Sequence, residues 1–430
     1  MTSERPQPDE AYVWICLPGA TEPIVAGRIE KRGEIFVFNY GRSYLARGDA
    51  IPIYREELPL EAGVIAPHPP LSIANCLRDG APDAWGRRVI VNRLTGSKGT
   101  EAATVEFDEL TYLLESGSDR IGALDFQASP TDYAPRRGGE ATLAELQASA
   151  EKVLAGEPLH PELDQALHHG SSIGGARPKA LLTDGTRKLI AKFSTSSDTF
   201  NVVKAEFIAM RLARACQINA AGVALAQASG KDIILVERFD RQRSGTGWTR
   251  RAMVSALTLF GLDEVAARHA SYEELAHRIR SEFSSPRDTL RELYKRVVFN
   301  VLVGNTDDHA RNHAAFWNGQ TLSLTPAYDI CPQPRTAREV NQAMKISGNA
   351  GDSRLATVLH LAPACHLSED DACDIIRMQV GAISSGWRGV CNEARLSEVD
   401  EKYLWRRQFL HPYAFDSLPD ALSDLRKWAD

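Results

Sequence analysis

Residues 304–312 read Gly-Asn-Thr-Asp-Asp-His-Ala-Arg-Asn, a polar stretch between two apolar segments. The apolar residues before it recur at helical spacing and predict an amphipathic helix that ends at Gly304; they are Leu290, Leu293, Tyr294, Val297, Val298, Val301 and Leu302. After it, the runs 313–317 and 321–324 flank Asn318-Gly319, which is typical of a β-hairpin. Asp329 follows that hairpin, so the order is helix, polar loop, hairpin and acidic residue.

The polar loop has the spacing of a phosphoryl-transfer site. Asp307 and Asn312 are five residues apart, as are Asp and Asn in the kinase catalytic loop H-R-D-x-x-x-x-N. In that loop the Asp accepts the hydroxyl proton and the Asn holds a metal ion. Asp329 stands where the metal-binding Asp of D-F-G follows in kinases. The order of these groups favours a kinase-like site.

A Lys and a Glu upstream extend the pattern. Strand-like runs around Asp184-Gly185 are followed by a helical segment, 201–216, and two further strand-like runs, which predicts a small antiparallel sheet with one helix. Lys192 lies on the second strand, and Glu206 lies on the helix among apolar residues. Kinases use such a pair to direct an ammonium group at nucleotide phosphates. A structural salt bridge or a solvated lysine fits these two residues equally well.

A Gly-rich segment, 171–179, opens the small sheet. Its sequence, Ser-Ser-Ile-Gly-Gly-Ala-Arg-Pro-Lys, lets the backbone approach a phosphate closely. It lacks the full spacing of a Walker A loop or of G-x-G-x-x-G. Taken alone, the fragment is better explained as a Gly-rich turn into a hairpin.

Three rival interpretations are weaker. His309 and His313 could ligate zinc on a helix, but no Glu stands between them as in H-E-x-x-H. His168-His169 is better explained as a polar loop pair than as a metal site. Asp307 and Asp308 could serve a hydrolase, but adjacent residues rarely face one ligand and no partner carboxylate is evident.

Composition bounds the remaining possibilities. The 430 residues contain 50 Lys and Arg and 56 Asp and Glu, a net charge of −6. This charge argues against nucleic-acid binding through a basic surface that extends over the whole chain. The seven cysteines are scattered and form no C-x-x-C pair, so neither a disulfide framework nor a zinc ribbon is indicated. No secretory signal or membrane-spanning stretch is evident, and we expect a cytoplasmic protein with reduced thiols and no membrane partner.

The N-terminal ~125 residues have their own pattern. Three strand-like runs, 11–17, 23–30 and 33–40, precede helical segments at 83–94 and 107–114. Residues 129–139 contain two prolines and two glycines and are typical of a linker.

Taken together, these segments resemble the HipA family of bacterial toxin-antitoxin serine/threonine kinases. The resemblance covers most of the chain, with the N-terminal ~125 residues more loosely alike. It is carried by segments 172–179, the strand ending in Lys192, 236–241, 304–312 and 324–330.

The resemblance implies an α+β, two-lobed protein-kinase-like fold, with a small antiparallel sheet lobe, a mainly helical lobe and an N-terminal β-rich cap subdomain. We expect three parts: residues 1–128, the N-terminal subdomain; 140–240, the small lobe; and 241–430, the large lobe.

The resemblance also implies roles for individual residues. Asp307 is expected to be the general base, with Asn312 and Asp329 holding Mg²⁺ and Lys192 contacting the phosphates of ATP, paired with Glu206. The other expected nucleotide contacts are the phosphate loop Gly174, Gly175, Ala176, Arg177, Pro178 and Lys179, the hinge Glu237, Arg238 and Phe239, and the pocket residues His309, Ala310, Arg311 and Tyr328. Ser172 matches the family's autophosphorylated serine, whose phosphate would repel a triphosphate and switch the kinase off.

The sequence departs from the family pattern at two places. Arg177-Pro178 adds a cation to the phosphate loop and removes one backbone N–H. Asp308 replaces a small residue and is expected to add charge near the metal ions.

The resemblance implies an ATP- and Mg²⁺-dependent serine/threonine kinase that acts as a growth-arresting toxin on a cellular protein. Aminoacyl-tRNA synthetases are among the family's targets, and a small DNA-binding antitoxin of the HipB type is the expected partner, so that DNA is reached only through it. Two alternatives stay open: a nucleotide-binding corepressor with little kinase activity, and a small-molecule kinase on the same fold.

Overall fold

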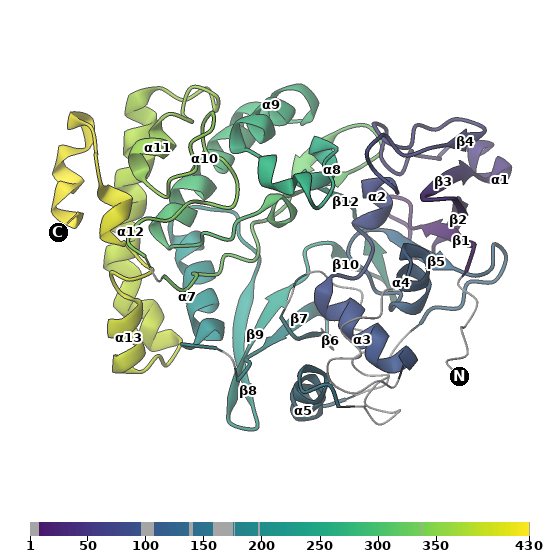
Figure 1. The fold of residues 1–430 in the computed structure, drawn as a ribbon, viewed down its shortest axis with the longest axis horizontal. Coiled ribbons are helices and arrows are strands. Elements are labelled where there is room, and N and C mark those ends of the chain that lie inside the picture. Colours follow the sequence, from purple (N-terminus) through teal and green to yellow (C-terminus); the bar gives the residue numbers. More distant parts are fainter. Residues whose placement is uncertain are drawn as a thin grey trace. The chain divides into compact units, whose positions relative to one another are not determined.

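The computed structural model describes residues 8–95, 107–136, 141–157, 175, 177–196, 198–335 and 337–429. The chain divides into two compact units. Figure 1 labels the helices and strands of both. Unit 1 comprises residues 1–195, 226–254 and 316–320, and unit 2 comprises 196–225, 255–315 and 321–430. The three-part division expected from the sequence stays a prediction. Among the helices of the described residues, none has the length and apolar character needed to cross a membrane.

A five-stranded sheet forms the N-terminal part of unit 1. Its strand order is β4-β3-β2-β1-β5, and the printed pairings are antiparallel. The strands are β1 (Glu10–Ile15), β2 (Ile24–Arg32), β3 (Ile35–Tyr40), β4 (Val64–Ile65) and β5 (Leu124–Gln127). The first three are the strands that the sequence predicts. The short helices α1 (Arg42–Leu45) and α2 (Asn75–Arg78) and the helices α3 (Ala84–Thr95) and α4 (Glu109–Glu115) lie between β3 and β5 in the sequence.

A second sheet, with order β6-β7-β9-β8, carries the predicted Asp184-Gly185 hairpin. Its strands are β6 (Lys179–Asp184), β7 (Arg187–Phe193), β8 (Val223–Ala228) and β9 (Lys231–Glu237). The helix α5 (Leu143–Leu154) begins with a capping box between Thr142 and Glu145. Trp85 of α3 and Phe193 of β7 share one apolar core with α5, so the N-terminal subdomain and the small sheet pack together inside unit 1.

The chain after Asp240 is predicted to be mostly helical, and here the prediction is wrong for one segment. Strands β10 (Arg241–Ser244) and β11 (Gly247–Arg250) form a hairpin, followed by β12 (Ala252–Ser255). The hairpin contains three arginines and no alternating apolar residues within β10, so the period-two signal of a strand is absent. Only Gly245 and Gly247 mark its turn.

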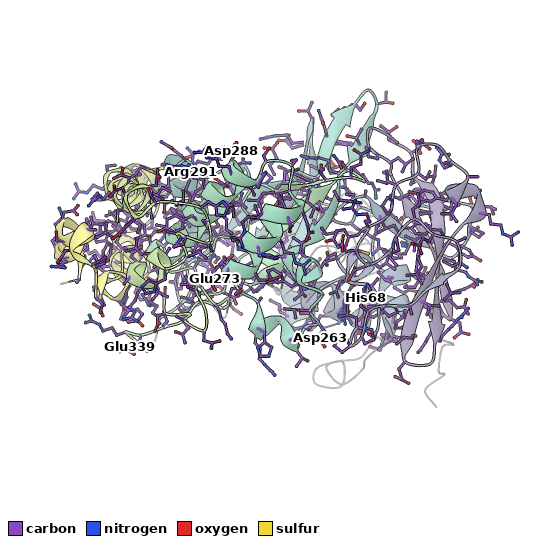
Figure 2. The ribbon with its side chains drawn as sticks, turned by 90° about the horizontal axis from the view of Figure 1, so that it is seen from above. His68, Asp263, Glu273, Asp288, Arg291 and Glu339 are labelled. Carbon is purple, nitrogen blue, oxygen red and sulfur yellow. The ribbon has the colours of Figure 1, made fainter. Side chains whose placement is uncertain are left out.

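Unit 2 is built around α10 (Pro286–Leu302), which contacts α9 (Tyr272–Glu282), α11 (Leu355–Leu359) and α12 (Glu369–Glu393). All seven apolar residues of the predicted helix are buried. Arg291, labelled with Asp288 in Figure 2, pairs with Asp371 at 3.3 Å near the exposed start of α10. The other helical elements are α7 (Val202–Ala215), α8 (Ala256–Phe260), α13 (Glu398–Leu404) and the 3₁₀ segments η3 (Ala266–His269), η4 (Ala310–Asn312), η5 (Pro412–Phe415) and η6 (Asp420–Trp428).

Gly304, at the end of α10, is required by its backbone and by its neighbour. Its φ is +67°, and an added Cβ would lie 2.8 Å from the carbonyl oxygen of Gln408. The C-terminal chain is held there because Leu410 donates its N–H to Leu302 at 2.7 Å. We therefore expect Gly304→Ala to lower the free energy of unfolding by about 2 to 4 kcal/mol, from left-handed strain and overpacking.

Urea unfolding monitored by circular dichroism measures this effect. Gly389→Ala is the matched control, because Gly389 lies in α12 with no atom near its missing Cβ. Alanine should stabilise that helix by up to about 1 kcal/mol. Equal effects of the two substitutions would contradict the packing argument.

Candidate active site

The polar loop 304–312 is held in place by backbone hydrogen bonds from a distant segment. Gln333 donates its N–H to Gly304 at 3.0 Å, and Ala343 donates its N–H to Thr306 at 2.9 Å. Asn305 in turn donates to the carbonyl of Asn300 on α10 at 2.9 Å. The loop is therefore fixed on both sides just before Asp307.

Asp307 and Asn312 are brought together by this loop. The side chain of Asp307 is exposed, as a group that meets a substrate must be, whereas Asn312 is buried in η4. Asn312 donates its amide Nδ2 to the carbonyl of Asp307 at 3.3 Å. With its amide nitrogen used in this way, Asn312 keeps its amide oxygen as an acceptor for another group.

Asp329 follows the predicted hairpin, which is formed by β13 (Ala314–Trp317) and β14 (Leu322–Leu324). Its φ is +58°, a left-handed conformation that is uncommon outside glycine. The preceding residues hold it there: Ala327 donates its N–H to Asn219 at 2.7 Å, and the Tyr328 hydroxyl donates to the Arg311 carbonyl at 2.6 Å. Strained backbone that is enforced by its surroundings is concentrated at functional sites.

The electrostatics of Asp307 reflect its neighbours. Burial of part of the carboxyl raises its pKa above the usual range for aspartate, and the charges of Asp329 and Asp308 add to that rise, while His309 opposes it. Asp307 and Asp329 thus lie near enough to repel each other. Two such carboxylates form a place where a cation is electrostatically favoured.

The donor set fits Mg²⁺. This ion takes oxygen ligands, keeps several waters and is usually bound by one or two carboxylates together with substrate phosphates. The Asn312 amide oxygen and the Asp329 carboxylate supply oxygens of that kind. Within the described residues, no group of three or more His, Cys, Asp or Glu side chains is placed to hold a metal ion. Mg²⁺ does not require such a group, because phosphates and waters supply its other ligands.

Asp308 is buried, whereas neighbouring Asp307 is exposed. Asp308 is 3% exposed, and one carboxylate oxygen, Oδ2, accepts hydrogen bonds from Tyr272 at 2.5 Å, Asn300 at 2.7 Å and the Nε2 of His313 at 2.7 Å. Burial alone would raise the pKa of Asp308, but His313 and these hydrogen bonds outweigh it and lower the pKa. Asp308 therefore anchors the loop from inside and stays ionised, and its charge acts on neighbouring Asp307; the expectation that it adds charge near the metal ions stays a prediction.

His313 belongs to the same buried network. Its Nε2 is bonded to Asp308 and its ring packs edge-on against Tyr272. Sequence reasoning considered His313 only as a zinc ligand and missed Tyr272, Asn300 and Asn305. No local signal could have found Tyr272, which is 36 residues from Asp308 in the sequence, whereas Asn300 and Asn305 lie close before Asp308 but carry no pattern that marks them.

The candidate nucleotide residues of unit 1 lie on the small sheet. Lys192 of β7 stands opposite Lys179 of β6 in an antiparallel pair, so both side chains leave the same face of the sheet. The predicted alternation is confirmed, because Leu189, Ala191 and Phe193 are buried on the other face. Two opposed ammonium groups concentrate positive charge on the face that contains Lys192.

Part of the predicted phosphate loop can be located. Gly175 has a φ of +107°, and a Cβ there would collide with the ammonium group of Lys179. The N–H of Gly175 is donated to Asp83, just before α3. Pro178 is buried beside β6 and Arg177 is partly exposed. Ser172, Gly174 and Ala176 lie outside the described residues, so the roles expected for them stay predictions.

The pairing of Lys192 with Glu206 stays a prediction. Glu206 is 2% exposed on α7, which is the burial that the sequence indicates for it. It belongs to unit 2, whereas Lys192 belongs to unit 1.

The predicted hinge, 237–239, contains an unexpected structural residue. Arg238 is 3% exposed and forms ion pairs with Asp119 at 3.0 Å and Asp240 at 2.8 Å. Its backbone N–H is donated to Lys188 at 2.9 Å, so this N–H is occupied; the hinge role of Glu237, Arg238 and Phe239 stays a prediction. The guanidinium ties the end of β9 to the 119–122 turn of the N-terminal subdomain. Glu237 is exposed and Phe239 is half-buried.

The cluster around Arg238 is fully paired. Arg241 is bonded to Asp119 and Asp240, and Asp240 also accepts the N–H of Gly122 at 2.8 Å. Neighbouring arginines hold the pKa of Asp119 well below its usual range despite its burial. Buried charges need such partners. The block 236–241 is thus explained by the attachment of the N-terminal subdomain to the small sheet.

The remaining predicted pocket residues lie around the loop. Ala310 is buried in η4, and His309 precedes it with a partly exposed side chain. Arg311 pairs with Glu264. Tyr328 uses its hydroxyl to hold Arg311, so its contribution is at least partly structural.

The α+β architecture and this loop together define a protein of the kinase-like class. Comparison with protein families then identifies the family within this class. Residues 171–387 match the HipA-like C-terminal domain, and residues 21–127 match the HipA N-terminal domain. The first match covers half of the chain, and the protein belongs to the HipA family.

Individual relatives are distant. A putative kinase, Y4mE, of Sinorhizobium fredii is 26% identical over 250 residues, which is 52% of this chain and 57% of the relative. The serine/threonine-protein kinase toxin HipA of Shewanella oneidensis is 25% identical over 183 residues, 37% of this chain and 42% of that protein. The chain thus spans about half the length of the curated relatives that it matches.

A solved structure confirms the fold. The complex of Shewanella oneidensis HipA, HipB and operator DNA contains a chain similar over 92% of this protein and 95% of that chain, with a TM-score of 0.63 and 16% identity. At this identity the likeness shows the fold alone. The expected HipA-type, kinase-like α+β fold is confirmed.

Proposed function

We propose that this protein is an ATP- and Mg²⁺-dependent serine/threonine protein kinase. The observation that carries the proposal is the joint placement of Asp307, Asn312 and Asp329 in unit 2. One loop presents an exposed carboxylate beside a buried amide, and a strained aspartate lies within electrostatic reach. Relatives named as kinases support the same assignment.

The residue roles follow from what each group can do. Asp307, with its raised pKa, accepts the proton of the attacking hydroxyl and orients that hydroxyl. Asn312 and Asp329 are the proposed Mg²⁺ ligands; bound Mg²⁺ offsets phosphate charge. Lys192 and Lys179 supply the cationic face for the nucleotide phosphates. The hydroxyl oxygen forms a bond to the γ-phosphorus of ATP, the bond from that phosphorus to ADP breaks, and ADP leaves.

The biological role is proposed by family analogy. The protein would act as a growth-arresting toxin by phosphorylating a cellular protein, with aminoacyl-tRNA synthetases as the class of target to test first. The named HipA–HipB–DNA complex supports a small DNA-binding antitoxin as its partner. Autophosphorylation at Ser172 is the proposed off-switch.

Intact-mass analysis after incubation with Mg²⁺-ATP tests the kinase proposal. The wild-type chain is expected to gain one phosphate, and Ser172→Ala is expected to gain none while still phosphorylating a target protein. Thr131→Ala, at an exposed position of unit 1, is the matched hydroxyl control and should gain phosphate normally.

The other outcomes separate the alternatives. Nucleotide binding without transfer to itself or to any protein would favour the corepressor or small-molecule kinase. Absence of nucleotide binding would overturn the kinase proposal.

A further inference from the structure

Four arginines of unit 2 lie near Tyr413, and the carboxylates that pair with them or act on Tyr413 among the described residues are those of Asp352, Asp416 and Glu339. The guanidinium groups of Arg335 and Arg354 both lie 5.8 Å from the centre of the Tyr413 ring. Arg338 pairs with Asp416, and Arg354 pairs with Asp352 at 3.3 Å. We call Arg335, Arg338, Arg354, Arg406 and His411 the arginine cluster.

Arg335 is held by few hydrogen bonds. Among the described residues it has no carboxylate partner, and its one hydrogen bond is a long one of 3.4 Å to the carbonyl of Arg338. Its Nε, like that of Arg354, is buried without a hydrogen-bond partner. A buried donor without an acceptor is costly and calls for an explanation, such as a bound water, an ion or another oxyanion.

Other groups in the cluster report the same positive potential. Burial, followed by the charges of Arg335, Arg338 and Arg406, lowers the pKa of His411 to about 4. His411 accepts the N–H of Tyr413 on its Nδ1, so a neutral ring suits its place. Burial lowers the pKa of Arg335 itself to about 10. Glu339, labelled in Figure 2, is an exposed acid on the same segment.

The cluster is connected to the candidate active site through the backbone. Arg335 and Arg338 lie on segment 333–343, whose two ends donate hydrogen bonds to Gly304 and Thr306. Arg335 is two residues after Gln333, and Gly304 is three residues before Asp307. At about 3.5 Å per residue, the backbone path from Arg335 to Asp307 is on the order of 20 Å, the span of about six extended residues.

We propose that the arginine cluster is a docking site for an anionic side chain of the protein substrate, a carboxylate or a phosphate monoester, within about six residues of the phosphate-accepting hydroxyl. Arg335, which has no carboxylate partner among the described residues, supplies the charge, and Arg406 adds to the positive potential at His411. The planar guanidinium of Arg335 offers paired N–H donors, a geometry suited to these oxyanions. This inference rests on the proposed kinase function and specifies its substrate class.

Peptide binding to the full chain without nucleotide tests the inference. The probes are fluorescein-labelled Ala-Gly-Ser-Gly-X-Gly-Ala peptides in which X is phosphoserine, Glu or Gln, and fluorescence anisotropy gives each Kd. The wild type is expected to bind at least one anionic peptide about tenfold more tightly than the Gln peptide, the strength of a charged hydrogen bond. Arg335→Gln should abolish that preference.

Matched variants isolate the cluster. Arg388→Gln removes an exposed arginine of α12 and should keep the full preference. Arg406→Gln is a second variant within the cluster and should weaken it, which keeps the test valid if Arg335→Gln unfolds. Preference for phosphoserine alone identifies a phosphorylated substrate segment, and equal preference for Glu identifies an acidic one.

Two outcomes would overturn the inference: no preference in the wild type, or a preference retained by both cluster variants. Because binding is measured without ATP, these results are independent of transfer. A chain that autophosphorylates yet ignores the anionic peptides would contradict the docking site alone, and one that binds them without transfer would contradict the kinase proposal alone.

Discussion

Asp307→Asn is expected to slow phosphoryl transfer by about 10³-fold, in the middle of the range for the loss of a positioned general base. Asparagine keeps the shape of the side chain but cannot accept the proton of the hydroxyl. The measurement is the single-turnover rate of phosphate incorporation at saturating Mg²⁺-ATP, followed by intact mass.

The same substitution should leave the protein at least as stable as the wild type. The folded state raises the pKa of Asp307, so the ionised carboxylate is disfavoured there and its charge opposes folding above that pKa. A neutral Asn removes the repulsion from Asp329. Thermal unfolding at pH 7 checks this, with Asp132→Asn, an exposed aspartate of unit 1, as the control for both measurements. Transfer at more than a tenth of the wild-type rate would refute Asp307 as the base.

Asp308→Ala, one residue further on, should have the opposite effect on stability. Removing this carboxylate leaves the Tyr272 hydroxyl, the Asn300 amide and the His313 Nε2 without their shared acceptor. Breaking a buried charged network from one side costs about 3 to 5 kcal/mol. Urea unfolding at pH 7 should show a loss of that size.

The pH dependence of this loss has a definite sign. The folded state lowers the pKa of Asp308, so its stabilising contribution is complete above the unfolded value, near 4, and is lost as the pH falls through the lower folded value. The difference between wild type and Asp308→Ala should therefore be largest at neutral pH and shrink below about pH 4. A small difference at pH 7, or one that grows in acid, would show that Asp308 does not carry the network.

The contrast between the two neighbouring aspartates shows where sequence reasoning stops. The spacing of Asp307, Asn312 and Asp329 is local enough to be recognised in the chain, and the fold it indicates is confirmed. Asp308 differs from Asp307 only in the direction of its side chain, which depends on Tyr272 and Asn300 from α9 and α10. The sequence therefore predicts the loop but not which carboxylate faces solvent.

The same limit applies to Arg238. Its backbone is expected to contact the nucleotide, which stays a prediction, but the sequence did not indicate that its guanidinium is buried against Asp119, 119 residues earlier. The β10–β11 hairpin was missed for a related reason, since its strands are polar and pair through backbone bonds rather than through an apolar face.

What the sequence by itself determined is the set of locally encoded elements: the helix that leads to Gly304, the hairpins at Asp184-Gly185 and Asn318-Gly319, and the order of the catalytic candidates. Short-range periodicity and turn chemistry specify these without distant partners. Only the tertiary structure decided that Asp308 anchors the loop from within, that Arg238 holds the N-terminal subdomain and that Arg335 lies beside Tyr413 with no carboxylate partner among the described residues. Burial and ion pairing arise between residues far apart in the chain, and their free energies depend on contacts that no local pattern encodes.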